Sequence, residues 1–221
     1  MESLVCGVDE AGRGPVVGPL VLGCAVFDAE GKAMLRDLKV RDSKKLSQSR
    51  RVHLEPLIKE VAVEWKVVRV SPVDIDRLRR NMSLNVIEAY KTAEMILSLE
   101  NTPSKIIIDS ADAVAENYAR KFASSVQSLN PEYILPEVLS EHKADDNHLE
   151  VSAASVLAKV DRDRCIEELK LTYGDFGSGY PSDELTQAFI RDVICSGEVP
   201  ECVRRSWNTL DRSRQTSICD Y

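Results

Sequence analysis

Short apolar runs alternate along the chain with longer stretches whose apolar residues recur at helical spacing. Residues 4–10 predict a strand, and the apolar run 17–27 predicts its hairpin partner across a glycine-rich turn. Ser47 is placed to cap a helix over 48–61, which Pro56 interrupts. The remaining predicted elements are strands at 63–70, 105–109 and 132–139 and helices at 83–99, 114–128, 147–171, 182–196 and 200–214.

This order of elements predicts a mixed β-sheet flanked by helices, with a helical appendage formed by the end of the chain. The 221 residues suit one globular domain with such an appendage, and a hydrophobic content of 43% is enough for a sizeable core. No stretch approaches the ~20 apolar residues of a membrane span, and the amino terminus lacks the basic flank and apolar segment of a secretory signal. We therefore expect a cytoplasmic protein that does not contact a membrane.

Cysteine, histidine and charge content narrow the chemistry further. The six cysteines are scattered without a CxxC pair and only three histidines are present, so reduced thiols are expected and a zinc site is not. The net charge of −7 argues against a nonspecific nucleic-acid coat protein, but basic residues gather locally and leave nucleic-acid catalysis open. The basic clusters are Lys44, Lys45, Arg50 and Arg51; Arg77, Arg79 and Arg80; and Arg204, Arg205, Arg212 and Arg214.

The most informative segment is Val8-Asp9-Glu10-Ala11-Gly12-Arg13-Gly14-Pro15, in which an apolar run ends on two carboxylates and a Gly-Arg-Gly turn. Carboxylates are hard oxygen ligands suited to Mg²⁺ or Mn²⁺, and a glycine-flanked turn lets backbone groups approach a sugar or phosphate. An Asp-Glu pair after a strand is by itself most often a solvated turn. Because neighbouring strand residues point to opposite faces, Asp9 and Glu10 share a site only if Glu10 already lies in the turn.

Further acids end or begin predicted elements. Asp109 follows Ile106-Ile107-Ile108 at the carboxyl end of a strand, where open α/β sheets bind ligands, although it could be an ordinary strand-end residue. Asp145 and Asp146 precede the long helix, where the alternative role is an N-cap. Four acids in one small volume would raise each other's pKa unless divalent cations, about 3.5–4 Å apart, neutralised them. The segment 161–164, Asp-Arg-Asp-Arg, predicts instead a surface stripe of salt bridges.

Residues 9–21, DEAGRGPVVGPLV, resemble the opening signature of type 2 ribonuclease H, the ribonuclease HII family, and most of all its archaeal branch. Further matches follow in the family's order and extend the resemblance from about residue 5 to residue 210. They are Asp42-Ser43-Lys44-Lys45-Leu46-Ser47, Ile106 to Ser110, His142-Lys143-Ala144-Asp145, Ala153 to Val160, and Gly177-Ser178-Gly179-Tyr180-Pro181.

The resemblance implies a ribonuclease H-like α/β catalytic domain over residues 1–181 and a C-terminal helical appendage over 182–221. It implies an endonuclease that hydrolyses the RNA strand of RNA–DNA hybrids and cuts 5′ of single ribonucleotides in duplex DNA. A two-metal-ion mechanism would leave a 3′-OH and a 5′-phosphate. One alternative is a recombinase or transposase nuclease of the same fold, which the Gly-Arg-Gly turn and the Gly-Tyr-Pro loop disfavour. The other is a non-catalytic hybrid-binding module, which would gain nothing from a cluster of acids.

The resemblance also assigns roles to single residues. The catalytic ligands of two Mg²⁺ or Mn²⁺ ions would be Asp9, Glu10, Asp109 and Asp145, with Asp146 as a neighbour. The contacts that recognise the ribonucleotide's 2′-hydroxyl would be Gly12, Arg13 and Gly14, with Tyr180 packing on the neighbouring deoxyribose. The remaining substrate contacts would be Ser43, Lys44 and Lys45, the two lysines through backbone phosphates. The first and last basic clusters are likewise expected to contact phosphates.

The end of the chain carries two further features. Asn208 stands where the family usually has a basic residue after Arg-Arg-Ser-Trp, so the basis for a phosphate contact at that position is missing. Gln215, Ile218 and Tyr221 have the spacing Gln-x-x-Ile-x-x-Tyr, which resembles the motif by which replication proteins dock on the sliding clamp. The alternative is a frayed polar tail. We expect the protein itself to be a monomer.

Overall fold

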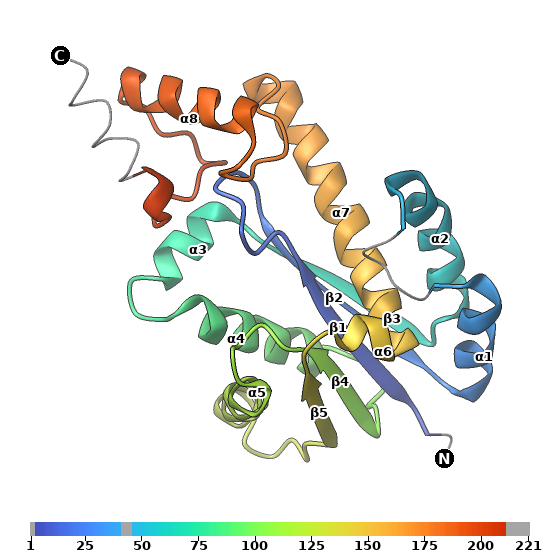
Figure 1. Cartoon of the computed structure of the whole chain (residues 1–221). Coiled ribbons are helices and arrows are strands. Elements are labelled where there is room, and N and C mark those ends of the chain that lie inside the picture. Colours follow the sequence, from blue (N-terminus) through green and yellow to red (C-terminus); the bar gives the residue numbers. More distant parts are fainter. Residues whose placement is uncertain (1–2, 41–45, 211–221) are drawn as a thin grey trace. The chain divides into compact units, whose positions relative to one another are not determined.

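The computed structural model describes residues 3–40 and 46–210, which form two compact units (Figure 1). The sheet unit comprises Met1–Ala11, Val21–Val68 and Ser83–Asp161. The turn unit comprises Gly12–Leu20, Arg69–Met82 and Arg162–Tyr221. The turn unit therefore joins three stretches that are distant in sequence, and the boundary expected between residues 181 and 182 falls inside it.

The central sheet has the strand order β3-β2-β1-β4-β5, and the predicted mixed sheet is confirmed (Figure 1). Strand β1 (Val5–Ala11) pairs antiparallel with β2 (Leu20–Phe27) and parallel with β4 (Lys105–Asp109). Strand β4 is also parallel to β5 (Glu137–Glu141), and β3 (Glu64–Val70) lies at the other edge. The parallel β1–β4 pair brings two strand ends to the same edge of the sheet.

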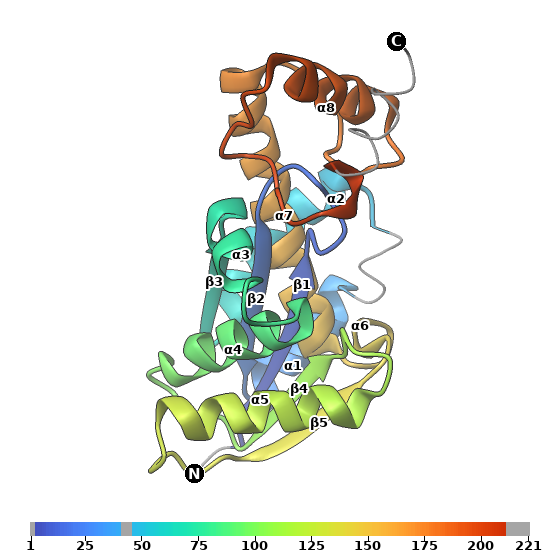
Figure 2. The same cartoon turned by 90° about the vertical axis from the view of Figure 1, so that its left-hand side faces the viewer.

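Helices cover both faces of this sheet. Helices α4 (Leu84–Leu97) and α5 (Ala115–Leu129) pack over the face formed by Cys6, Val8 and Ile108, and Figure 2 shows both helices along this face. Helices α1 (Ala29–Leu38), α2 (Gln48–Val61) and the first part of α7 (Leu149–Tyr173) enclose the core on the opposite face. The short helix α6 (Ala144–Asn147) precedes α7.

Two strand glycines allow α7 to lie directly on the sheet. A Cβ added to Gly7 would come 2.1 Å from the backbone carbonyl carbon of Glu150, and one added to Gly23 would come 2.7 Å from the carbonyl oxygen of Ala154. Any side chain at either position would push the helix away. Because Asp9 lies two residues after Gly7 on the same strand, its side chain points to the same face, toward α7.

The turn unit is built around a second apolar core. Val16, Val17, Phe176 and Ile190 are buried there, together with the later part of α7 and with α8 (Glu184–Ser196). Helix α3 (Pro72–Leu78) belongs to the same unit. This core supports the segment Gly12–Leu20, which contains the Gly-Arg-Gly turn.

Most predicted elements are confirmed within a few residues, and three differ. The partner of β1 begins at Leu20, because Val17 instead forms an isolated bridge with Val203. The helix predicted over 200–214 is wrong for its first part, since residues 201–207 are turns tied to the segment 16–18 and helical backbone begins at Asn208. The strand predicted at 132–139 is observed as β5, further along the chain. Helices α1 and α3 and the four-residue α6 had no counterpart in the sequence analysis.

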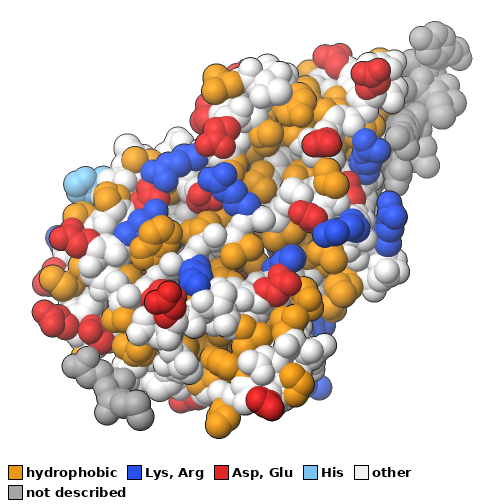
Figure 3. Space-filling model, turned by 180° about the vertical axis from the view of Figure 1, so that it is seen from behind, with side chains coloured by type: hydrophobic (Ala, Val, Ile, Leu, Met, Phe, Trp, Pro, Cys, Tyr) orange, Lys and Arg blue, Asp and Glu red, His pale blue; other side chains and the backbone are white. Residues whose placement is uncertain are grey.

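Two properties of the described residues concern apolar helices and the distribution of surface charge. No helix there combines the length and the apolar character needed to cross a bilayer. Figure 3 shows the molecule from behind relative to Figure 1. On this face, basic and acidic side chains are intermixed among apolar ones. The net negative charge is therefore not a single continuous acidic surface on this face.

Candidate active site

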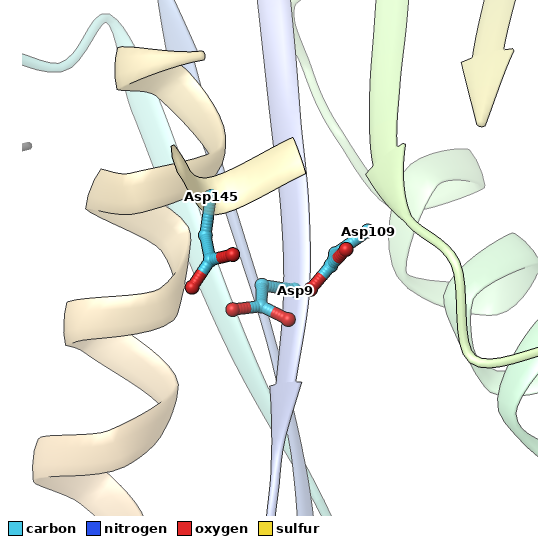
Figure 4. A group of neighbouring side chains, drawn as sticks. All are labelled: Asp9, Asp109 and Asp145. Carbon is cyan, nitrogen blue, oxygen red and sulfur yellow. The ribbon is translucent and has the colours of Figure 1, made fainter. Parts of the chain in front are cut away.

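Three aspartates from three elements converge in the sheet unit. Asp9 lies on β1, Asp109 ends β4 and Asp145 lies on α6, and each offers a carboxylate oxygen within 4.8 Å of the others. Figure 4 shows Asp9 between the other two, with the carboxylates turned toward one another. Asp9 is 5% exposed and Asp145 is fully buried. The structure therefore brings together three of the four acids that the sequence assigned to a metal site.

Strand register places the first two acids side by side. Val8 is the parallel partner of Ile108, and both side chains lie in the core beneath α4 and α5. Side chains alternate along a strand, so the next residues, Asp9 and Asp109, point to the other face together. The two carboxylates follow directly from the register of β1 and β4.

The third acid is positioned by hydrogen bonds at both ends of α6. The helix begins after Lys143, whose φ of 57° is left-handed and turns the chain sharply. The backbone N–H of Ala144 donates to the Asp109 carboxylate at 3.0 Å. At the other end, His148 Nε2 lies 2.9 Å from Oε1 of Glu141 on β5. Asp145 is thus held over the sheet edge by contacts from two neighbouring strands.

The environment of Asp9 shifts its pKa. Burial and, to a smaller extent, the neighbouring Asp109 carboxylate raise the pKa of Asp9 from its ordinary 3.8 to about 7. A hydrogen bond from Ser155, the charge of Lys159 and the Glu10 backbone N–H, at 2.8 Å, oppose this rise. Three buried or half-buried carboxylates that repel one another form a donor set of hard oxygens, which fits a divalent cation such as Mg²⁺ or Mn²⁺.

Two partners of Asp9 were not assigned a role from the sequence. Ser155 and Lys159 lie one helical turn apart on α7, so both reach the same face of the helix. Ser155 is buried in a stretch of α7 that is otherwise almost entirely apolar. A hydroxyl and an ammonium group four residues apart on one face of a mostly apolar helix segment were the signal that could have identified them, although Ser152 gives the same segment a second buried hydroxyl.

Glu10 lies inside β1 and not in the turn. It is the antiparallel partner of Leu22, and strand alternation directs its side chain to the face opposite to Asp9. Among the described residues, the clustered carboxylates are Asp9, Asp109 and Asp145, without Glu10 or Asp146. The condition under which Glu10 would join Asp9 is therefore not met in this structure, and its role as a ligand stays a prediction.

The predicted recognition residues Gly14 and Tyr180 meet within the turn unit. A Cβ at Gly14 would touch the Tyr180 ring at 3.4 Å, and Tyr180 is 39% exposed. The N–H groups of Val16 and Val17 donate to the carbonyl of Gly179 at 2.8 and 3.2 Å, which ties the two loops together. Gly12 has a φ of 82°, a conformation that a side chain would strain.

Two arginines are buried where the sequence predicted solvent-exposed roles. Arg162 is only 8% exposed, so the predicted surface position is wrong for this residue, although its guanidinium lies 3.8 Å from the Asp163 carboxylate. Its guanidinium donates to the Ser178 carbonyl at 2.9 Å and lies 5.2 Å from the Tyr180 ring centroid. Arg204 is completely buried, so the predicted phosphate contact is wrong for it. Both side chains bind protein groups of the turn unit instead.

Two groups of predicted residues lie outside the described residues. The substrate contacts Ser43, Lys44 and Lys45 form the first, and the clamp-binding residues Gln215, Ile218 and Tyr221 form the second. Their assignments stay predictions.

Comparison with known proteins now decides the family. The family model for ribonuclease HII matches residues 6–210. The chain belongs to the ribonuclease HII family. It is 44% identical over 211 residues to ribonuclease HII of Methanococcoides burtonii, which covers 94% of this chain and 98% of the relative.

Two solved structures of ribonuclease HII relatives share the fold. The crystal structure of ribonuclease H2 from Pyrococcus horikoshii has a TM-score of 0.86 and 42% identity, and the match covers 96% of this chain and 98% of that one. The ribonuclease HII in a complex with PCNA from Archaeoglobus fulgidus has a TM-score of 0.84 and 40% identity, with 98% and 100% covered. The predicted ribonuclease H-like fold is confirmed, and this member of the family is an endoribonuclease whose carboxylate cluster suits divalent-metal use.

Proposed function

We propose that this ribonuclease HII hydrolyses the RNA strand of RNA–DNA hybrids and cuts duplex DNA on the 5′ side of single ribonucleotides, leaving a 3′-OH and a 5′-phosphate. The observation that carries the proposal is the group of three aspartates within 4.8 Å of one another in a member of this family. A non-catalytic hybrid-binding module is disfavoured, because a buried negative cluster opposes the binding of a polyanion.

The proposed cofactors are two Mg²⁺ or Mn²⁺ ions, held by Asp9, Asp109 and Asp145. Glu10 is proposed as the fourth ligand, which requires that its side chain turn from the face that strand alternation gives it. When bound, such ions lower the pKa of a water molecule and stabilise the departing 3′ oxygen. The protein's own residues prepare the site. Lys159 and Ser155 favour the ionised form of Asp9, and Asp109 fixes the start of the helix that carries Asp145.

Selectivity for a ribonucleotide is proposed to lie in the turn unit. The Gly12–Arg13–Gly14 backbone would contact the 2′-hydroxyl, which alone distinguishes RNA from DNA at one position. Tyr180, which touches Gly14 and is partly exposed, would pack on the neighbouring sugar. Ser43, Lys44 and Lys45 would contact the substrate backbone and set its register without reading bases.

Three labelled duplexes test this function against its alternatives: one with a single ribonucleotide, one RNA–DNA hybrid and one of DNA alone. We expect cleavage of the first two, with mapped 3′-OH and 5′-phosphate ends, and none of the third. Cleavage of the all-DNA duplex would indicate the recombinase or transposase alternative, and tight binding without cleavage would indicate a binding module. Parallel reactions with Mg²⁺ and Mn²⁺ identify the preferred ion.

We further propose that the chain acts as a monomer and docks on a sliding clamp through Gln215, Ile218 and Tyr221. The support for the clamp is the spacing of these residues and the existence of a PCNA complex of the Archaeoglobus fulgidus relative. Size-exclusion chromatography with light scattering tests the monomer, and the clamp is taken up in the Discussion.

A further inference from the structure

The guanidinium group of Arg204 binds three carbonyl oxygens of the segment that contains the Gly-Arg-Gly turn. Its Nη2 donates to Gly12 at 2.6 Å, its Nη1 to Arg13 at 3.0 Å and its Nε to Gly18 at 2.9 Å. The side chain is completely buried in the turn unit. A planar guanidinium with donors in a fixed fork can bind three acceptors at once, which a lysine ammonium at the end of a flexible chain cannot do in the same geometry.

The chain around Arg204 binds the same turn. Its backbone N–H donates to Val16 at 2.8 Å, and Val203 forms the bridge with Val17. The indole Nε1 of Trp207 donates to the Gly14 carbonyl at 3.2 Å, and the Trp207 ring lies 4.7 Å from the Arg204 guanidinium. Residues 203–207 therefore fix the carbonyl direction of every residue from Gly12 to Gly14.

Those carbonyl directions determine where the turn's donors point. In a planar trans peptide, the C=O of one residue and the N–H of the next point in opposite directions. With the Gly12 and Arg13 carbonyls turned toward Arg204, the N–H groups of Arg13 and Gly14 point away from it. The peptide after Gly14 contributes no donor, because residue 15 is proline.

We propose that Arg204 is the positioning residue for ribonucleotide recognition, holding the Gly12–Arg13 and Arg13–Gly14 peptides so that both N–H groups face the substrate's 2′-hydroxyl. The inference rests on the proposed function of the turn. The buried positive charge also polarises the peptides that it binds, which strengthens their N–H donors. Arg204 does not touch the substrate, and its effect passes through the turn.

Arg204→Lys tests this role, because it keeps the charge and removes the three-way fork. The readout is the ratio of dissociation constants for an all-DNA duplex and for the same duplex with one ribonucleotide, measured by fluorescence anisotropy in EDTA so that no cleavage occurs. The fraction of active protein cancels from this ratio, so partial unfolding alone does not change it. The matched control is Arg191→Lys, an exposed arginine on α8.

We expect the wild type and Arg191→Lys to share one preference for the ribonucleotide, and Arg204→Lys to lose roughly tenfold of it, as expected when about two hydrogen bonds are misaligned. The ratio of kcat/KM values for the single-ribonucleotide duplex and the long hybrid should fall in the same variant with metal present. A folded Arg204→Lys protein whose binding preference stays within about twofold of the wild type overturns the inference.

A second variant decides the question if Arg204→Lys shows no cooperative melting transition. Trp207→Phe keeps an aromatic ring beside Arg204 and releases the Gly14 carbonyl, which anchors the far side of the Arg13–Gly14 peptide. That peptide is then held by Arg204 alone and can rotate about Gly14, so a loss of roughly threefold in preference is expected. An unchanged preference in this variant also overturns the inference. A wild type without any preference and without cleavage contradicts the proposed function itself, whichever result the variants give.

Discussion

The Asp109 carboxylate accepts a hydrogen bond from the backbone N–H of Ala144 at 3.0 Å, so one clustered acid fixes the start of the helix that carries another. Helix α6 has only four residues, too few to be stable without tertiary contacts. At the other end of α6, the His148 side chain contacts the Glu141 carboxylate on β5. The position of Asp145 is therefore set by the ends of β4 and β5. A substitution at Asp109 can change both the charge of the cluster and the position of the helix that carries Asp145.

Asp109→Asn should abolish cleavage while leaving the fold intact. The amide oxygen can still accept from Ala144, so α6 should stay in place, but the charge needed to bind a divalent ion is lost. We expect a fall in kcat/KM on the single-ribonucleotide duplex of at least about 1,000-fold, equal to about 4 kcal/mol of barrier. Asp37→Asn, at an exposed position on α1, is the control. Near-native turnover by Asp109→Asn with an unchanged melting temperature would contradict the metal assignment.

Asp145 and Asp146 are adjacent on α6 and provide a matched pair. Only Asp145 belongs to the three-carboxylate cluster and is fully buried. Asp145→Asn should therefore lower activity nearly as severely as Asp109→Asn, with slight residual activity, whereas Asp146→Asn should stay within about threefold of the wild type. Steady-state kinetics on the single-ribonucleotide duplex at several metal concentrations measure both. The reverse order of severity would move the ligand to Asp146.

The raised pKa of Asp9 predicts a pH-dependent stability in the absence of metal. The unfolded chain ionises Asp9 near its ordinary pKa of 3.8, and the folded protein only near 7. Between these values the native state binds more protons, so stability contributed by protonated Asp9 is present at low pH and is lost as the pH rises through about 7. Asp9→Asn removes this dependence.

In EDTA at pH 8, Asp9→Asn should melt at least about 4 °C above the wild type, and the two curves should converge toward pH 4. Adding Mg²⁺ should raise the melting temperature of the wild type more than that of the variant. Thermal melts followed by circular dichroism from pH 4 to pH 8 measure this, with Asp37→Asn as the control. Parallel curves for wild type and Asp9→Asn at every pH would show that Asp9 is not the destabilised group.

The acids were predictable from the sequence, and the residues that support the turn were not. Asp9 and Asp109 end short apolar runs, and the ends of adjacent parallel strands must meet. Arg162 and Arg204 stand in charged segments that are typical of solvated helices, and nothing local shows that their guanidinium groups are buried. Arg204 binds Gly12, 192 positions earlier in the chain, and such a distant contact leaves no periodic signal.

The polar composition of residues 200–214 led to a wrong helix prediction for the first part of this segment. Residues 201–207 have the composition of a polar helix, but the Cys202 carbonyl and the Arg204 N–H bind the segment 16–18, and the next two N–H groups donate to Asp76. For Glu10 the condition stated from the sequence was correct, because strand alternation separates neighbouring side chains unless one lies in a turn. The structure places Glu10 inside the strand. The pairing of β1 with β2 therefore determines to which face its side chain points, and amino-acid composition alone did not predict this.

Tyr180→Ala should weaken cleavage of a single embedded ribonucleotide more than cleavage of a long hybrid. Packing of an aromatic ring on a nucleotide contributes ~1–3 kcal/mol, and a long hybrid offers many alternative registers that the single ribonucleotide does not. Tyr180→Phe is the matched control, since it keeps the ring against Gly14 and beside Arg162. We expect kcat/KM to fall about tenfold on the single-ribonucleotide duplex in the alanine variant alone. Equal losses on both substrates would indicate that Tyr180 only supports the loop.

The carboxy-terminal sequence Gln-Thr-Ser-Ile-Cys-Asp-Tyr predicts weak binding to a sliding clamp that is confined to residues 215–221. A helical turn would set Ile218 and Tyr221, three residues apart, on one side, and Gln215 would fill a polar pocket. The residues 215–221 supply one aliphatic and one aromatic anchor, Ile218 and Tyr221, where the motif normally has two aromatic residues, so the affinity of this segment should be low. Deleting the seven residues should abolish clamp binding and leave cleavage of short free duplexes unchanged.

Calorimetric titration of the tail peptide against the clamp measures this binding, with Thr216→Ala as the control and Tyr221→Ala as the variant expected to lose it. A peptide that gives neither heat nor competition with the full-length protein would exclude the tail as a clamp ligand.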